Sequence, residues 1–255
     1  MQVITKVPST TNNGEAFDLI LAYADTAAEI KSAQKLRYDV YVKELNVHLP
    51  NATDGIDHDK YDEYCKHLIV VNSKTQETVG TYRVLTSQDA QKTNGFYTET
   101  EFDISQFDAH RDLVCECGRS CIHPDYRDGT VIMLLWTGLT RFLYDAKLKY
   151  MLGCASVNLA DGGLQASQVW HLAQLDIAKH AQAPKAFPLH PYPLEQLPKF
   201  QEGTKIPALI KGYLKIGARI CGEPAWDKDF NAADFPVVID LSCMRKSYRK
   251  HFGIE

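Results

Sequence analysis

The chain has 255 residues, 45% of them hydrophobic, which is enough to bury the core of one large domain or two small ones. Its formal net charge of −4 and its isoelectric point near 6.1 argue against a general nucleic-acid-binding protein, because phosphate contacts require a dominant basic face. Any basic contact surface must therefore be local.

Three features of the sequence predict a location inside the cell. The start, MQVITKVPSTTNNGE, has neither the basic end nor the apolar stretch of a signal peptide, and apolar runs such as VIMLLW are far too short to span a membrane. The seven cysteines are odd in number and lie in apolar or mixed segments, a pattern typical of reduced thiols. We expect a cytoplasmic protein that contacts the inner face of a membrane peripherally at most.

The first half of the chain predicts strands and one long helix. Residues 1–15 are polar and aperiodic, which indicates a disordered N-terminus. FDLILAYA predicts a strand, and TAAEIKSAQKLRYDVYVKEL predicts a helix that Thr26 caps, with Glu29 completing a capping box. After an Asp-rich loop over residues 47–64, HLIVV and TVGTYRVL predict an antiparallel hairpin.

The second half alternates strands with helices. DLVCECGRSCI and YMLGCASVN predict strands, and TVIMLLWTGLTRFLYDAKL and GLQASQVWHLAQLDIAKH predict helices. A Pro-rich stretch then precedes the helix PALIKGYLKIGA, the strand FPVVIDL and the basic tail SCMRKSYRKHF. This order predicts one mixed α/β domain over residues 16–255, with residues 184–207 as a Pro-rich insertion or lid.

The segment CECGRSC sets three cysteines around two charged side chains. A zinc site would need a second Cys or His pair, so we expect no metal and interpret the cysteines as small packing residues. Glu116 and Arg119 would face opposite sides of a regular strand, but a bulge at Gly118 would bring them to one face. They would then form either a functional pair in a cleft or a plain interior ion pair.

The sequence HPDYRDGTVI follows this strand directly. Free backbone N–H groups at the start of an apolar helix suit a phosphate, although the same residues also form an ordinary turn. The candidate phosphate-binding residues are Arg127, Asp128, Gly129 and Thr130.

A bulged strand, a phosphate-binding turn, an apolar helix and the strand YMLGCASVN together resemble the central motif of the GNAT acyltransferases. The resemblance implies a mixed, mostly antiparallel central sheet flanked by helices, whose central strands splay apart around the pantetheine arm of a thioester. It implies that backbone N–H groups near Gly118 face the thioester carbonyl. It also implies that Ala155 and Ser156 contact the pantetheine.

Two closer resemblances narrow the family. LRYDVYVKEL, the loop ending DGIDHDKYD, VGTYRVL and ECGR are similar to the acyl-homoserine-lactone synthases. GFYTETEFD, GRSCIHPDYR, LLWTGL, GCAS, IKGYLKIGARICGEPAWDKDFNAADF and SYRKHF resemble the ornithine N-acyltransferases of ornithine-lipid synthesis, which are often labelled hemolysin-like.

The second resemblance implies transfer of a 3-hydroxylated fatty acyl group from acyl carrier protein to the α-amine of ornithine, giving lyso-ornithine lipid. No resident cofactor is implied, because the acyl-phosphopantetheine of the carrier is a co-substrate. Glu116 is the candidate base, since the attacking amine must be neutral. Arg119 or Arg83 would bind the substrate carboxylate. The other substrate-binding candidates are Arg37, Asp54, Asp57, Asp59 and Asp227, with Asp229 as an acidic rival.

The basic tail is either a docking surface for the acidic carrier protein or a solvated face. Its residues are Arg245, Lys246, Arg249 and Lys250. The alternative functions are a lactone synthase, an N-acyl amino acid synthase with another amine acceptor, and a non-enzymatic membrane-lytic protein.

Overall fold

The computed structural model describes residues 1–10, 14–49, 52, 54–228 and 230–254. The chain folds into two compact units, each built from separate stretches of sequence. Unit 1 comprises residues 1–93, 117–146 and 252–254, and unit 2 comprises residues 94–116 and 147–251. Strand β6 (Val114–Ile122) contributes its first three residues to unit 2 and the rest to unit 1.

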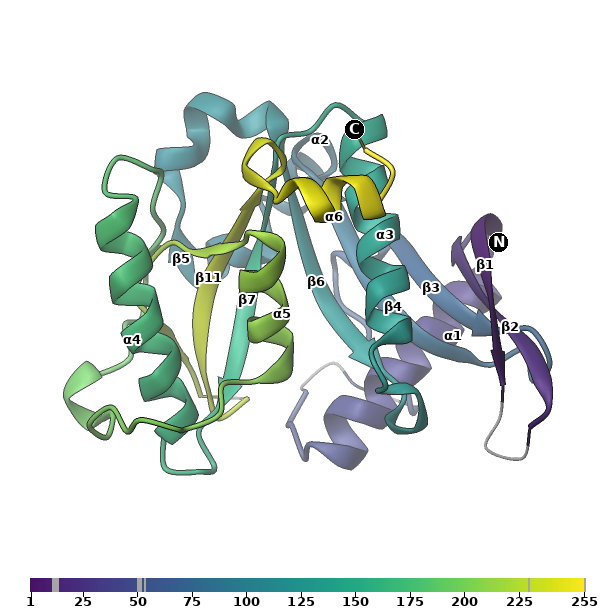
Figure 1. Cartoon of the computed structure of the whole chain (residues 1–255), viewed down its shortest axis with the longest axis horizontal. Coiled ribbons are helices and arrows are strands. Elements are labelled where there is room, and N and C mark those ends of the chain that lie inside the picture. The colour runs from purple at the N-terminus through teal and green to yellow at the C-terminus, as the bar shows by residue number, and fades with distance from the viewer. Residues whose placement is uncertain (11–13, 50–51, 53, 229, 255) are drawn as a thin grey trace. The chain divides into compact units, whose positions relative to one another are not determined.

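Unit 1 contains four antiparallel strands in the order β1-β2-β3-β4 and two long helices (Figure 1). Its regular elements are β1 (Gln2–Thr10), β2 (Ala16–Tyr23), α1 (Ala27–Tyr38), a π-helical turn (Asp39–Glu44), β3 (Lys66–Asn72), β4 (Thr78–Thr86), α2 (Ser87–Ala90) and α3 (Thr130–Asp145).

Helices α1 and α3 cover opposite faces of the unit 1 sheet. Ala33 of α1 packs in one cluster with Ile69 and Val71 of β3. Leu68, directly before Ile69 in β3, lies against Gly138 of α3. Because successive strand residues point to opposite faces, β3 is buried on both sides, which accounts for its continuous apolar run HLIVV.

The start of α1 follows the predicted capping pattern. The Thr26 hydroxyl accepts a hydrogen bond from the Glu29 amide, and the Glu29 carboxylate accepts one from the Thr26 amide, so the capping box is confirmed. The predicted hairpin is confirmed as β3 and β4, which pair antiparallel. None of the seven cysteines, all of which belong to the described residues, forms a disulfide.

The prediction of a disordered N-terminus is wrong for residues 2–10. These residues form β1, which pairs with β2 from Gln2↔Tyr23 to Thr10↔Ala16. The sequence shows little alternation here because β1 is an edge strand, where polar side chains and Pro8 are tolerated. Its stability comes from the pairing and not from its own composition.

Unit 2 is built around the long antiparallel pair β7–β11, which runs from Tyr150↔Asp240 to Asn158↔Ala232. Helix α4 contacts β7 and β9. The regular elements of the unit are η4 (Tyr97–Thr100), β5 (Phe102–Asp103), β7 (Tyr150–Asn158), α4 (Leu164–Lys179), β8 (Phe187–Pro188), α5 (Ala208–Ile216), β9 (Arg219–Ile220), β10 (Ala225–Asp227), β11 (Ala232–Asp240) and α6 (Lys246–His251).

Strand β6 joins this pair in parallel over three residue pairs, from Val114↔Tyr150 to Glu116↔Leu152. The expected mixed, mostly antiparallel α/β fold with flanking helices is therefore confirmed, since β6–β7 is parallel and the other described pairs are antiparallel. The splaying of the central strands and the single domain over residues 16–255 stay predictions. Among the described residues, no helix combines the length and the apolar character that crossing a membrane requires.

The Pro-rich segment 184–207 is anchored at several points inside unit 2. Its β8 pairs with β5, and its Tyr192 amide donates to the Pro224 carbonyl at 2.9 Å. Within this segment Phe187 is 46% exposed, whereas Tyr192 is buried against Trp226. Its role as a lid stays a prediction.

Two glycines give a direct test of the packing in unit 1. A Cβ at Gly80 of β4 would overlap the Cγ1 atom of Val131 in α3, whereas a Cβ at Gly118 would meet nothing within 4 Å. We expect Gly80→Ala to lower the free energy of unfolding by about 1–3 kcal/mol through overpacking. Gly118→Ala is the control, and denaturant titration measures both. Equal stabilities for the two variants would contradict this packing.

Candidate active site

Strand β6 carries its irregular backbone at Arg119. The φ angle of Arg119 is 52°, in the left-handed region that non-glycine residues rarely adopt. Gly118, where we expect the irregularity, is not among the positive-φ glycines. The irregularity thus lies one residue after the predicted one. A local pattern identifies glycine, which adopts a positive φ most easily, whereas tertiary contacts decide which residue is held in that conformation.

Glu116 is buried in unit 2 and holds the turn η4. Its Oε2 atom accepts from the Tyr97 amide at 2.9 Å, and its Oε1 atom accepts from the Thr98 amide and the Thr98 hydroxyl, each at 2.6 Å. The side chain is 6% exposed. Glu116 therefore binds two consecutive N–H groups at the start of η4.

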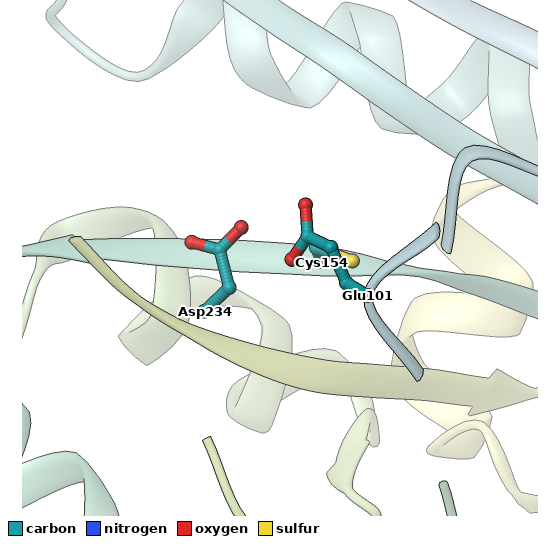
Figure 2. Close-up of side chains that lie close together, drawn as sticks. All are labelled: Glu101, Cys154 and Asp234. Atoms are coloured by element: carbon teal, nitrogen blue, oxygen red, sulfur yellow. The ribbon is translucent and has the colours of Figure 1, made fainter. Parts of the chain in front are cut away.

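Two further carboxyl groups face each other in unit 2, from Glu101 and Asp234 (Figure 2). Glu101 directly follows η4, and Asp234 lies in β11, 2% exposed. One oxygen of each carboxyl group and the sulfur of Cys154 lie within 4.8 Å of one another. We call Glu101 and Asp234 the carboxyl pair.

Strand registers explain why these side chains meet. Asp234 lies opposite Ser156 of β7, and Cys154 is two residues from Ser156, so all three point to one face of the β7–β11 pair. Asp227 of β10 points to the same face, because its partner Ala232 is two residues from Asp234. Glu101 reaches this face from outside the strands.

Burial and like charge perturb the carboxyl pair. Burial, and then the negative charge of Asp234, raise the pKa of Glu101 to about 9. A hydrogen bond between the two side chains and the charge of Asp227 act in the same direction, while a hydrogen bond with the Tyr97 side chain opposes them. At neutral pH, Glu101 is therefore protonated and shares its proton with Asp234.

Cys154 is not poised to act as a nucleophile. Burial, followed by the negative charges of Glu101 and Asp234, raises the pKa of its thiol well above the usual value. The reactive form of cysteine is the thiolate, which this environment disfavours. Cys154 instead lies 3.8 Å from the Thr98 hydroxyl and fills space beside the carboxyl pair.

The spacing of Glu101, Cys154 and Asp234 would also allow a metal ion to bind. Their protonation makes this a poor ligand set, because a metal requires a deprotonated thiol and ionised carboxylates. The raised pKa values of Cys154 and Glu101 favour the protonated forms of both. The cluster suits a shared proton better than a cation.

Unit 1 holds a separate network of buried charges centred on Arg37, which is fully buried. The Arg37 guanidinium donates to Asp57 Oδ2 at 2.7 Å and to both carboxylate oxygens of Asp62, at 2.7 and 2.9 Å. Burial alone would raise the pKa of Asp62, but the hydrogen bonds and charge of Arg37 outweigh burial and lower it.

Two more arginines complete this network. Arg83 donates to Asp59 Oδ1 at 2.6 Å, and Arg119 donates to Asp59 Oδ2 at 3.2 Å. Three arginines thus meet three aspartates, and their formal charges cancel. The Nε2 atom of the buried His67 donates to the Asp62 carbonyl oxygen at 2.9 Å, and burial lowers the pKa of His67, so it adds no charge.

Several of the predicted site residues belong to this charge network. Arg37, Arg83, Arg119, Asp57 and Asp59 are indeed brought together, but they bind one another. Asp54 is exposed in the loop and Asp227 lies in unit 2. Asp229 lies outside the described residues. The interior ion-pair alternative is thus realised for Arg119, with Asp59 and Asp57 as its partners in place of Glu116, and the substrate-binding roles stay predictions.

The predicted phosphate-binding residues also have internal partners. Arg127 forms a bidentate pair with Glu44, at 2.6 and 2.7 Å, and the Thr130 amide donates to Asp128 Oδ1 at 2.8 Å. Gly129 has a φ angle of 102° and begins α3. In β7, Ala155 is buried and Ser156 is exposed. Contact of these residues with pantetheine or phosphate stays a prediction, and a phosphate would have to displace both internal bonds.

Sequence reasoning missed Glu101 and Asp234. Asp234 had one usable signal, a charged residue directly before the apolar run FPVVIDL, but the strand extends three residues further back than that run. Glu101 lies in GFYTETEFD, a segment that carries part of the family resemblance, but no periodicity distinguishes it from Glu99 and Asp103 beside it.

Comparison with known proteins agrees with this architecture. A family model described as an acetyltransferase (GNAT) domain matches residues 36–137. This match assigns a GNAT acetyltransferase domain to less than half of the chain, and the relatives below extend the assignment.

Characterised relatives cover nearly the whole chain. The L-ornithine N(alpha)-acyltransferase of Agrobacterium fabrum (strain C58) is 32% identical over 241 residues, which cover 89% of this chain and 82% of the relative. The L-ornithine N(alpha)-acyltransferase of Rhodobacter capsulatus is 31% identical over 245 residues, which cover 90% and 92%. The chain belongs to the L-ornithine N(alpha)-acyltransferase family.

Solved structures share the fold at low sequence identity. An N-acyl amino acid synthase from uncultured soil microbes, FeeM, is 9% identical with a TM-score of 0.56, and the match covers 89% of this chain and 92% of that one. The CoA-dependent acyl-homoserine lactone synthase BjaI is 15% identical with a TM-score of 0.51, covering 89% and 83%. The fold of the chain is therefore that of the GNAT-type synthases.

Removing the Arg37 side chain from the centre of the charge network should destabilise the fold. We expect Arg37→Ala to lower the free energy of unfolding by about 3–5 kcal/mol, because Asp57 and Asp62 would stay buried without their cation. The control Lys35→Ala removes an exposed pair with Asp39 and should cost less than about 1 kcal/mol. Urea titration of both proteins checks this, and similar losses would contradict a central role for Arg37.

Proposed function

We propose that this acyltransferase moves a fatty acyl group, typically 3-hydroxylated, from acyl carrier protein to the α-amine of ornithine, giving lyso-ornithine lipid. Membership of the L-ornithine N(alpha)-acyltransferase family supports the acceptor. The observation that carries the chemistry is the buried carboxyl pair, since its pKa suits the proton of an amine. A cytoplasmic location near the inner membrane face would fit the product.

The reaction requires one proton to be removed from the acceptor. The neutral amine attacks the thioester carbonyl carbon, a C–N bond forms, the C–S bond breaks, and the carrier thiolate leaves and is protonated. The attacking nitrogen must lose a proton in this process. A general base must be strong enough to take this proton and must be ionised at the working pH, and an α-amino group ordinarily titrates near pH 8.

The carboxyl pair meets this requirement better than Glu116 does. A carboxylate offers about four acceptor sites, and three of those on Glu116 receive hydrogen bonds from Tyr97 and Thr98. In contrast, the ionised form of Glu101 is strongly basic, because its pKa is raised to about 9. We assign proton removal to the carboxyl pair, with Glu101 as the acceptor of the proton.

A basic surface on unit 2 supports a carrier protein as the donor. Gly217 ends α5, and a Cβ there would lie 3.4 Å from the Cys243 carbonyl oxygen, so the chain leading into α6 packs on the end of α5 (Figure 1). Residues 204–222 and 241–254 contain eight Lys and Arg and no Asp or Glu. Five exposed members lie in α5 and α6 or directly before α6, and we call them the α5–α6 basic surface: Lys211, Lys215, Arg245, Lys246 and Lys250.

This surface has the charge that an acidic carrier requires. Within the described part of the chain, the ion pairs leave all five members of the α5–α6 basic surface without an acidic partner. Uncompensated charge of one sign steers an oppositely charged protein and raises its association rate. No separate cofactor enters this scheme, because the acyl-phosphopantetheine arrives with the carrier.

An acceptor assay tests the reaction and the base together. The purified protein is incubated with 3-hydroxyacyl carrier protein and with ornithine, lysine, glycine or S-adenosylmethionine, and thiol release and the acylated product are measured. We expect ornithine to be used best. Thiol release with no acceptor would overturn the proposed acyl transfer, and preference for S-adenosylmethionine would indicate lactone synthesis.

For the base, we expect Glu101→Gln to lower kcat by about 10²–10⁴-fold while Glu77→Gln, an exposed control, leaves kcat unchanged. The basic form of Glu101 appears as the pH rises through about 9, so kcat of the unaltered enzyme should rise from pH 7 to 9. The Gln variant should lose this rise. An unchanged kcat in the variant would remove Glu101 as the proton acceptor.

Charge reversal tests the docking surface. We expect the double change Lys246→Glu and Lys250→Glu to raise KM for acyl carrier protein by about tenfold at low salt. The rate with a small carrier-free acyl thioester should be unaffected. The matched control is Lys6→Glu with Lys31→Glu, two exposed lysines of β1 and α1. Equal KM values for the two double variants would place the docking surface elsewhere.

A further inference from the structure

We propose that Glu116 is a positioning residue that fixes η4 so that Glu101 faces Asp234, and that it takes no proton itself. This inference rests on the proposed function, since it concerns how the carboxyl pair is held. It assigns to Glu116 a role different from the base that the sequence pattern favours.

A short series of hydrogen bonds joins Glu116 to Glu101. The Glu116 carboxylate holds the backbone N–H groups of Tyr97 and Thr98 and the Thr98 hydroxyl. The Thr98 carbonyl in turn accepts from the Glu101 amide at 3.1 Å. Only one residue, Thr98, therefore separates the Glu116 carboxylate from the backbone of Glu101.

Glu101 is held from its other side as well. Its carbonyl accepts from the Leu189 amide at 2.8 Å, in the Pro-rich segment. With both backbone groups bonded, the position of Glu101 is set by η4 on one side and by that segment on the other. The backbone position therefore directs the Glu101 side chain toward Asp234. Charge does not favour this contact, because two carboxylates repel each other.

Burial makes this arrangement sensitive to Glu116. Thr98 is fully buried and Glu116 is 6% exposed, so water cannot replace a lost bond between them at little cost. A glutamine at position 116 keeps one acceptor oxygen but directs an NH₂ group at an N–H donor of η4. We expect η4 to shift, which separates Glu101 from Asp234.

The groups that act on Glu101 come from four elements. Asp234 of β11 and Asp227 of β10 add negative charge, Tyr97 of η4 contributes a hydrogen bond, and Cys154 of β7 stays a protonated thiol. When Glu101 moves away from Asp234, the repulsion weakens, so its pKa falls toward the ordinary glutamate value. The alkaline rise of kcat should then move to lower pH.

The experiment compares pH profiles of kcat for the unaltered enzyme, Glu116→Gln, Thr98→Val and Thr98→Ser. Thr98→Val removes the hydroxyl bond to Glu116 at nearly constant shape, while Thr98→Ser keeps it. We expect the rise in kcat to shift by about one pH unit toward acid in Glu116→Gln and in Thr98→Val. Thr98→Ser should keep the profile of the unaltered enzyme.

Each alternative gives a different result. If Glu116 is the base, Glu116→Gln abolishes the reaction while Thr98→Val leaves the midpoint in place, which overturns the inference. If Glu116 only stabilises the fold, melting temperatures fall and the midpoints of all variants stay equal, which also overturns it. Should Glu116→Gln fail to fold, the two Thr98 variants decide alone.

The experiment distinguishes failure of the proposed function from failure of the positioning role. If Glu101→Gln retains full activity toward ornithine, the carboxyl pair is not the base, whatever the Glu116 variants do. If Glu101→Gln is inactive but the Thr98 and Glu116 variants keep the original midpoint, the base is correct and the positioning role is wrong.

Discussion

The contact between Glu116 and the turn η4 is the constraint on which the proposed chemistry depends. One carboxylate in β6 binds two consecutive backbone N–H groups and a hydroxyl of a turn 18 or 19 residues earlier in the chain. N–H groups at the start of a helical turn point away from it, so the acid and the turn satisfy each other. The turn then delivers Glu101 to the face of the β7–β11 pair where Asp234 lies.

The two units use buried charge in opposite ways. In unit 1, three arginines and three aspartates neutralise one another, and the carboxylates of Asp59 and Asp62 are held ionised with lowered pKa values. In unit 2, burial and then the negative charge of Asp234 raise the pKa of Glu101 to about 9. The network in unit 1 stabilises the fold. The carboxyl pair in unit 2 binds a proton with a pKa close to that of an amine.

Much of the fold follows from local sequence. The capping box at Thr26, the hairpin of β3 and β4, and strand β7 with its limits at Tyr150 and Asn158 agree with the pattern, because caps and periodicity act over a few residues. Strand β1 did not follow from the local pattern, because an edge strand depends on pairing with its neighbour for its stability. The carboxyl pair was also beyond local reasoning, since Glu101 and Asp234 are 133 positions apart and meet only through strand register.

The central claim is that Glu101 holds a proton near neutral pH because it is buried and faces Asp234. The most direct test is a ¹³C NMR titration of the side-chain carboxyl groups of glutamate in the unaltered protein and in Glu101→Gln. The account predicts one glutamate resonance that titrates near pH 9 and is missing from the variant. If every glutamate of the folded protein titrates near its ordinary value, about 4.3, the carboxyl pair does not exist as described and the account is contradicted.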